Sequence, residues 1–275
     1  MRSDGDGRRM SAQYDEIGAT YVAWKDTPIP RYAEVPTVRR LLTGLIERRA
    51  VLDLACGTGY YSRLFRQWGA ARVVGVDVSE SMVAAARDAE MKHPMGIEYF
   101  VGDAADLSVL GSFDFAAATY LLHYAETVND MRRMARSMAA NLKPGGQMLA
   151  LLPEPGYVMG QGETEQYGFT YRLVTSGQDW RLVHADVHTE PPFSIEYRHW
   201  SRNIYEEALT AAGFTDLRWH PFEVSSEGLA KFGEAYWRDI LNNPVSAILT
   251  ARLSKESGAI TSRKAPCPPP TTLGP

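Results

Sequence analysis

Short apolar runs alternate with helix-period segments between residues 37 and 152 of this chain. Five of the runs predict buried strands, over 50–54, 72–76, 97–101, 113–119 and 147–152. Apolar residues spaced three or four positions apart predict one helix before the first strand, over 37–47, and three between later strands, over 60–68, 79–93 and 128–142. This alternation is typical of an α/β fold with a doubly wound, mostly parallel, Rossmann-like sheet.

The pattern changes after Pro153, where short alternating strands replace the strand–helix repeat. Strands are predicted over 169–174, 180–187, 194–199 and 217–224, and helices over 201–212 and 227–241. The first two of these strands flank Ser176–Asp179, which predicts a hairpin within a β insert of about 156–192. We find no internal repeat and no second full domain, so a single domain over 10–253 is predicted.

Both ends of the chain differ from this domain in composition. Residues 1–9 are polar and charged, and 254–275 are polar with a proline-rich end, so both are predicted to be disordered tails. Between the first tail and the domain, aromatic and aliphatic side chains share one helical face: Tyr14, Ile17, Tyr21 and Trp24. Residue spacing alone does not distinguish a packing stripe from a ligand-covering segment here.

Composition restricts the class of protein. The chain has 275 residues, 45% hydrophobic and 23% charged, which is ordinary for a globular enzyme. Its net charge of −4 argues against a nucleic-acid partner. Only two cysteines are present, which favours a reducing, cytoplasmic location, and no apolar run approaches the roughly 20 residues of a membrane span. We therefore expect a soluble cytoplasmic protein.

A glycine turn, Ala55–Gly59, follows the first strand and opens the first helix of a βαβ unit. Such a turn lets the backbone approach a ligand, and the helix start presents free N–H groups. Asp77 ends the second strand, where a carboxylate can accept both hydroxyls of a ribose. A dinucleotide fingerprint would need a third glycine at position 62, which is Ser62. The unit therefore predicts a nucleoside site of another kind.

At these residues the chain resembles class I S-adenosylmethionine (SAM) methyltransferases, in the small-molecule type of bacterial secondary metabolism. The family's first motif reads V-L-D-x-G-C-G-x-G, and the chain departs from it at Ala55, where only a small residue is needed. The turn Leu142–Gly146 matches the L-K-P-G-G turn before the family's fifth strand. The resemblance implies SAM as cofactor, a C-terminal antiparallel hairpin, an insert over the acceptor pocket and an N-terminal helical lid over 10–36.

The resemblance also implies the residues that hold the cofactor. Asp77 would accept the ribose hydroxyls, and Asp103, at the end of the third strand, would accept the adenine amino group. The complete predicted set is Tyr14, Tyr21, Asp53, Ala55, Gly57, Gly59, Asp77, Val78, Met82, Gly102, Asp103, Ala104 and Thr119.

Three residues are candidates for a role in catalysis: His123 after the fourth strand, Glu154 after the fifth, and Tyr21 in the lid. His123 has the intrinsic pKa of a base near neutrality, but a purely structural histidine explains it equally well. Glu154 lies between two prolines and would accept a hydrogen bond from a ring N–H, unless it is a solvated loop residue. Tyr21 would act as a weak acid or base, or pack against the sulfonium.

These features predict methyl transfer from SAM to a ring carbon or nitrogen of a small, heteroaromatic metabolite, by a monomer or homodimer. O-methylation of a phenol or carboxylate, and SAM binding without catalysis, are the alternatives. No metal site is predicted, because His184 and His188 lie in a strand-like stretch without the glutamate of an H-E-x-x-H motif.

Overall fold

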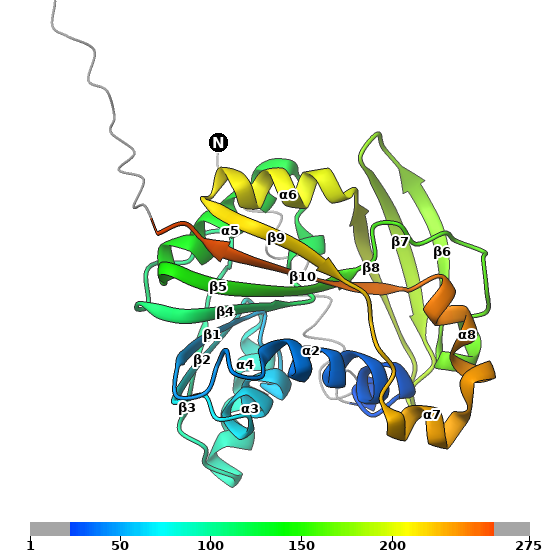
Figure 1. Ribbon diagram of the computed structural model, residues 1–275, viewed down its shortest axis with the longest axis horizontal. Coiled ribbons are helices and arrows are strands. Elements are labelled where there is room, and N and C mark those ends of the chain that lie inside the picture. Colours follow the sequence, from blue (N-terminus) through cyan, green and yellow to red (C-terminus); the bar gives the residue numbers. More distant parts are fainter. Residues whose placement is uncertain (1–22, 256–275) are drawn as a thin grey trace, which may run out of the picture.

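The computed structural model describes residues 23–255, which form two β-sheets and the helices around them (Figure 1). The larger sheet has seven strands, β1 (Ala50–Leu54), β2 (Arg72–Asp77), β3 (Ile97–Val101), β4 (Phe113–Thr119), β5 (Leu142–Pro153), β9 (Phe214–His220) and β10 (Ser246–Leu253). The smaller sheet has three, β6 (Phe169–Ser176), β7 (Trp180–Val187) and β8 (Phe193–Trp200). Residues 1–9 and 256–275 of the predicted tails, together with Tyr14 and Tyr21, lie outside the described residues.

The larger sheet is mostly parallel, in the order β3-β2-β1-β4-β5-β10-β9. Strands β1 to β5 run parallel, and β10 pairs antiparallel with both β5 and β9. The chain order reverses between β1 and β4, so the loops after these strands diverge and open a crevice at their carboxyl ends. The predicted doubly wound sheet with one antiparallel strand is confirmed.

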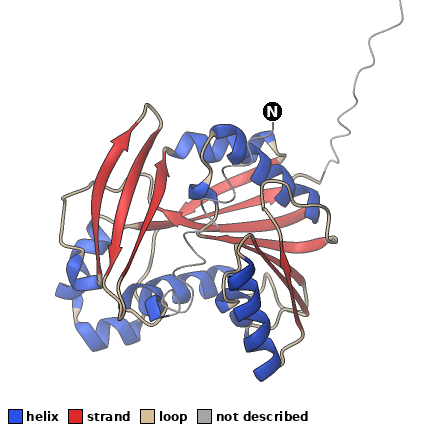
Figure 2. Cartoon of the chain, turned by 180° about the vertical axis from the view of Figure 1, so that it is seen from behind, coloured by secondary structure: helices blue, strands red, loops and turns tan. Residues whose placement is uncertain are grey.

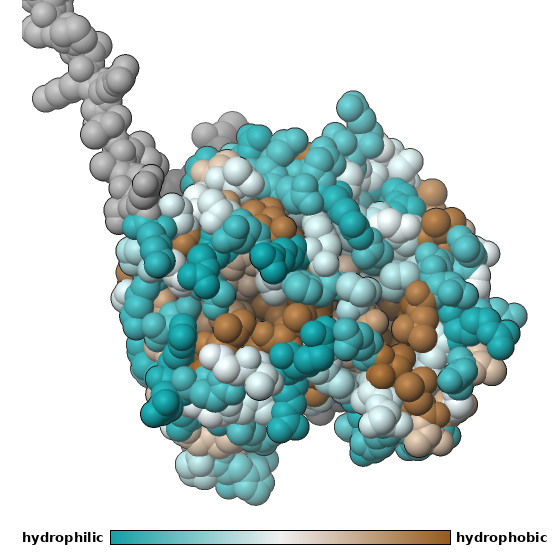
Figure 3. Space-filling model, viewed as in Figure 1, coloured by the Kyte–Doolittle hydropathy of each residue, from teal (hydrophilic) through white to brown (hydrophobic). Residues whose placement is uncertain are grey.

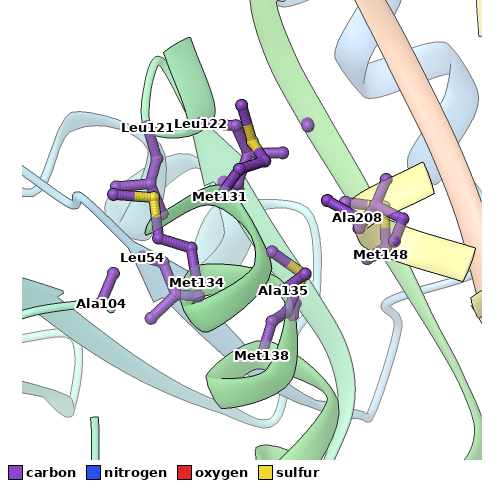
Figure 4. Packing of buried hydrophobic residues seen from close by; sticks show 14 of the residues in the cluster. Leu54, Ala104, Leu121, Leu122, Met131, Met134, Ala135, Met138, Met148 and Ala208 are labelled. Atoms are coloured by element: carbon purple, nitrogen blue, oxygen red, sulfur yellow. The ribbon is translucent and has the colours of Figure 1, made fainter. Parts of the chain in front are cut away.

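Helices cover the two faces of this sheet (Figure 1). On one face lie α2 (Val35–Leu42), α3 (Tyr60–Gln67) and α4 (Glu80–Lys92), and on the other α5 (Val128–Asn141) and α6 (Arg202–Ala211). The inward-facing methionines of α5, Met131, Met134 and Met138, pack in one core with Leu54 and Leu122, as Figure 4 shows. Their spacing of three and four residues puts them on one face of the helix.

The smaller sheet stands beside the carboxyl ends of the main strands, as both ribbon views show (Figures 1 and 2). Its strands pair antiparallel in the order β6-β7-β8. Because β8 runs to Trp200, the insert extends past the boundary predicted near residue 192. Tyr167 and Phe169 pack with Trp237 of α8 (Glu234–Asn242), which attaches this sheet to the C-terminal helices.

Two predicted helices differ from those observed, and one observed strand was not predicted. The helix predicted over 37–47 is α2, which begins earlier, at Val35, directly after a π-helix, Pro30–Glu34, and ends at Leu42. Thr37 lies inside α2, where its hydroxyl donates a hydrogen bond to the Ala33 carbonyl. The helix predicted over 227–241 is broken at Gly233, which has φ +79°, into α7 (Ser226–Phe232) and α8. Strand β10 was not predicted.

Apolar side chains gather near the middle of one face of the molecule (Figure 3). A groove between the end of α2 and strands β4, β5, β9 and β10 is lined by apolar Leu41, Leu45, Phe115 and Met148. It is also lined by polar side chains of β9 and β10, among them Arg218, His220 and Thr250. No helix in the described range 23–255 has the length and apolarity needed to cross a membrane.

Candidate functional site

Two cavities meet at the carboxyl edge of the larger sheet. One, of about 600 Å³, lies over the ends of β1, β2 and β3, and we call it the strand-end cleft. The other, of about 620 Å³, lies between the β4 and β5 loops and the smaller sheet, and we call it the aromatic cavity. Tyr120 and Tyr124 line both, so the two cavities adjoin at these side chains.

Most of the predicted cofactor residues line the strand-end cleft: Ala55, Gly57, Asp77, Val78, Met82, Gly102, Asp103, Ala104 and Thr119. They come from the loops after β1, β2, β3 and β4, four segments that the parallel sheet brings to one edge. Sequence motifs on separate strands therefore converge on one cleft.

Asp77 joins two of the loops around the cleft. One carboxylate oxygen accepts a hydrogen bond from the Gly57 N–H at 2.8 Å, and the other accepts one from the Ser79 N–H at 3.0 Å. Asp103 accepts a hydrogen bond from the Ala105 N–H at 2.8 Å, which orients its carboxylate in the same way. Both acids are thus preorganised beside apolar Val78 and Met82. The two carboxylates can accept hydrogen bonds from the hydroxyls and amine of an adenosyl group, and the apolar side chains fit its ring.

Asp53 and Gly59 support the cleft without lining it. The Asp53 carboxylate is fully buried, accepts a hydrogen bond from the Ser62 hydroxyl at 2.5 Å, and so links β1 to α3. Burial is the main cause that raises the pKa of Asp53 to about 7, against the opposing hydrogen bond from Ser62. Gly59 has φ +82°, and a Cβ there would collide with the Tyr99 hydroxyl. Ser62 therefore has a structural role at the position where a dinucleotide fingerprint places glycine.

Ala55 also lines the cleft, with φ +57° in the left-handed region. The departure from the family's glycine is therefore more than a matter of size, because a left-handed backbone favours glycine over any residue with a Cβ. The alanine keeps the turn at an energetic cost.

The aromatic cavity is built mainly by ring-bearing side chains. Its lining includes Trp24, Tyr120, His123, Tyr124, Phe169, Tyr171, Phe193 and Tyr197. Five of these come from segments far from the glycine turn, in the residues before α2 and in the smaller sheet. Rings at many orientations around one space are suited to a flat apolar ligand.

His123 lies in the wall of the aromatic cavity, as its place after β4 predicted. It is buried, its ring lies 4.2 Å from that of Tyr124 and 5.2 Å from that of Tyr197, and Nδ1 has no hydrogen-bond partner within the described residues. Burial, reinforced by His199, holds the pKa of His123 well below its usual value. The imidazole is therefore neutral at physiological pH, which makes it a weak base.

Glu154 does not line either cavity. Its carboxylate accepts hydrogen bonds from the Arg202 guanidinium at 2.8 Å and from the Gly156 N–H at 2.9 Å, and the residue is nearly buried. The side chain contacts the first residue of α6 and lines no cavity in which an acceptor could bind. The prediction that Glu154 touches the acceptor is therefore not supported by its position.

Replacing Arg202 with Met is expected to lower the free energy of unfolding by about 1–3 kcal/mol, because the Glu154 carboxylate would stay buried without its cationic partner. Urea denaturation at pH 7 measures this loss. The matched control is Arg136→Met on the exposed face of α5. Equal denaturation midpoints for the two variants would show that the ion pair does not stabilise the fold.

Glu34 is a residue of the aromatic cavity that the sequence did not predict. It ends the π-helix before α2, its exposed fraction is 0%, and one carboxylate oxygen accepts a hydrogen bond from the Tyr120 hydroxyl. Burial raises the pKa of Glu34, while the nearby Lys25 charge and the Tyr120 hydroxyl oppose that rise. The sequence feature that could have identified Glu34 is an acidic residue in a mostly apolar stretch, Ile29–Leu42, that begins inside the predicted lid.

The chain is similar to known methyltransferases. A family described as a methyltransferase domain matches residues 51–146. A dTDP-4-amino-2,3,4,6-tetradeoxy-D-glucose N,N-dimethyltransferase of Saccharopolyspora spinosa is 34% identical over 110 residues, which are 40% of this chain and 42% of that protein. A ubiquinone biosynthesis O-methyltransferase of Coxiella burnetii is 34% identical over 184 residues, 65% of this chain and 70% of the relative.

The solved structure of the CcbJ methyltransferase from Streptomyces caelestis has the same fold. Its TM-score is 0.63 at 18% identity, and the alignment covers 88% of this chain and 98% of that one. The chain spans less than half the length of the first curated relatives it matches, between 30% and 42% of each. The family match over 51–146 contains every residue that lines the strand-end cleft.

Proposed function

This chain belongs to the SAM-dependent methyltransferase family, and we propose that it transfers the methyl group of SAM to a small, flat, heteroaromatic metabolite. One observation carries the proposal: the strand-end cleft adjoins a second, aromatic-walled cavity at Tyr120 and Tyr124. A cofactor held in the first and an acceptor held in the second would meet at these two side chains. The methylated atom is proposed to be a ring nitrogen or carbon.

Positioning supplies most of the proposed catalysis. SAM bound in the strand-end cleft supplies an electrophilic methyl group, and the loops of Asp77 and Asp103 would hold its nucleoside. Trp24, Tyr171 and Tyr197 would orient a flat acceptor against the junction and exclude water from it. Orientation of two reactants can contribute roughly 7–11 kcal/mol to a barrier, without an obligatory base or metal.

The relatives named above act on an amino sugar nucleotide and in ubiquinone biosynthesis, according to their names. Both names indicate small-molecule acceptors, and the acceptors differ. In this chain the many rings in the cavity wall favour a flat aromatic over a sugar, because aromatic rings pack edge-to-face and offset-stacked against one another. The acceptor class is therefore proposed from the cavity rather than from the relatives.

Methyl-labelled SAM, incubated with the protein and a panel of indoles, azaheterocycles and phenols, is expected to label a ring nitrogen or carbon. Mass spectrometry and NMR locate the label. Label on oxygen would favour a phenol O-methyltransferase instead. S-adenosylhomocysteine binding with no label on any compound of the panel would contradict the proposed acceptor class and favour a SAM-binding protein without catalysis.

Replacing Ala185 with Phe is expected to abolish transfer while leaving the binding of S-adenosylhomocysteine within about twofold. Ala185 is buried in β7 in the wall of the aromatic cavity, so a larger ring fills acceptor space, whereas Ala185 does not line the strand-end cleft. The matched control is Ala71→Phe at an exposed position. Full transfer by Ala185→Phe would show that the acceptor binds elsewhere.

A further inference from the structure

We propose that Glu34 recognises the acceptor, by accepting a hydrogen bond from a ring N–H or a phenolic O–H of the flat molecule in the aromatic cavity. This inference rests on the proposed function, and it assigns to Glu34 the recognition that sequence reasoning gave to Glu154. Glu34 is the one carboxylate among the described residues that line this cavity.

The hydrogen bonds of Glu34 are incomplete. Its Oε1 accepts the Tyr120 hydroxyl, whereas Oε2 is buried and has no hydrogen-bond partner among residues 23–255. An ionised carboxylate accepts several hydrogen bonds, and leaving one of its oxygens buried and unpaired is unfavourable. A donor on a bound molecule would satisfy Oε2. The other described residues that line the cavity offer rings, aliphatic groups and hydroxyls but no second acid.

A chain of hydroxyls fixes the direction of this carboxylate. The Tyr120 oxygen lies 3.1 Å from the Ser246 hydroxyl, and because the single Tyr120 proton is donated to Glu34, Ser246 must be the donor in that contact. Tyr120 itself has φ +57° and lines both cavities. Glu34 is thus bonded to a side chain at the junction of the two cavities.

The charges around Glu34 favour its ionised form over what burial alone would allow. The Lys25 ammonium lies 5.1 Å from the centre of the Tyr120 ring and 5.7 Å from that of Tyr60. Two groups, Lys25 and Tyr120, lower the pKa of Glu34. The Glu34 charge in turn raises the pKa of Tyr60 and of Tyr171. Burial remains the larger effect and raises the pKa of Glu34. The ionised form accepts hydrogen bonds through both oxygens and donates none, and the proposed recognition belongs to that form. This makes the site selective for donors.

The test compares pairs of probes that differ only in the donor: indole with 1-methylindole, and phenol with anisole. Ligand-observed NMR titrations of the protein with S-adenosylhomocysteine present measure their affinities without requiring turnover. For the wild type we expect at least one donor to bind about tenfold more tightly than its methylated partner. Glu34→Gln is expected to abolish that preference, because its amide keeps the Tyr120 contact through oxygen and presents NH₂ in place of Oε2.

Two further variants keep the test independent of folding. Glu34→Met, which fills the same space without a polar atom, is also expected to bind both members of a pair equally. Glu98→Gln, at an exposed ion pair with Arg72, is the matched control and should keep the wild-type preference. Retained binding of S-adenosylhomocysteine shows that each variant is folded.

The outcomes separate this inference from the function on which it rests. A preference shown only by the indole pair identifies a methyl acceptor with a ring N–H. A preference shown only by the phenol pair identifies a methyl acceptor with a phenolic O–H. Both results support the role of Glu34. A preference that persists in Glu34→Gln overturns it, as do equal affinities, or no binding of any probe, in the wild type. Methyl transfer is scored separately in the labelling experiment, so it can succeed where this inference fails.

Discussion

Replacing Asp77 with Ala is expected to weaken the binding of S-adenosylhomocysteine by about 1–3 kcal/mol, or roughly 5- to 150-fold. The loss has two sources. A ribose would lose its carboxylate partner, and the Gly57 and Ser79 N–H groups would lose the acceptor that holds both loops against the cleft. Isothermal titration calorimetry of the wild type and the variant measures the difference.

Two controls separate these sources. Thermal unfolding without ligand reports the loss of loop contacts alone. Asp77→Asn keeps one carbonyl oxygen and should fall between Asp77→Ala and the wild type in affinity. If Asp77→Ala and the wild type titrate alike, Asp77 does not contact the ribose, and the cofactor would have to be held from the Asp103 side of the cleft.

Replacing Asp53 with Asn is expected to remove a pH-dependent loss of stability on the order of 4 kcal/mol. Burial raises the pKa of Asp53 to about 7 in the folded state from 3.8 in the unfolded chain. Below about pH 4 both states are protonated and stability is complete. As the pH rises from 4 to 7 the unfolded chain loses the proton that the folded protein retains, so stability falls. Above pH 7 the loss is constant.

The measurement is the free energy of unfolding by urea at pH 5, 6, 7 and 8, without ligand. The stability of Asp53→Asn relative to the wild type should increase along this series, whatever its value at pH 5. Asp88→Asn, at an exposed position on α4, is the control and should show no such trend. A parallel pH dependence for the wild type and Asp53→Asn would mean that Asp53 is ionised throughout.

Local patterns predicted the strands and helices of the parallel half of the fold, because each strand there is a short, mostly apolar run bounded by turns. Strand β10 was missed for a physical reason. Its apolar run, Val245–Leu249, follows α8 closely, and a short run of this kind is equally compatible with a helix segment. Only its pairing with β5 and β9 makes it a strand, and those partners are distant in the sequence.

The two cavities also differed in how far the sequence could predict the residues that line them. The strand-end cleft follows from short motifs at strand ends, so its residues could be predicted by position. The aromatic cavity depends on contacts such as Glu34 with Tyr120, 86 residues apart, and Tyr120 with Ser246, 126 residues apart. Spacing carries no information about such pairs. Glu154 was misjudged for a related reason, since its partner Arg202 lies 48 residues away.

The smaller sheet has a consequence for how this protein can diverge. Strands β6, β7 and β8 supply much of the aromatic cavity but none of the side chains of the strand-end cleft. Mutations in these strands can therefore alter acceptor choice while the nucleoside contacts stay intact. Tyr120 and Tyr124, which belong to both cavities, do not have this freedom. Gene variants that acquire new acceptors should accumulate changes over 169–200 and conserve both tyrosines.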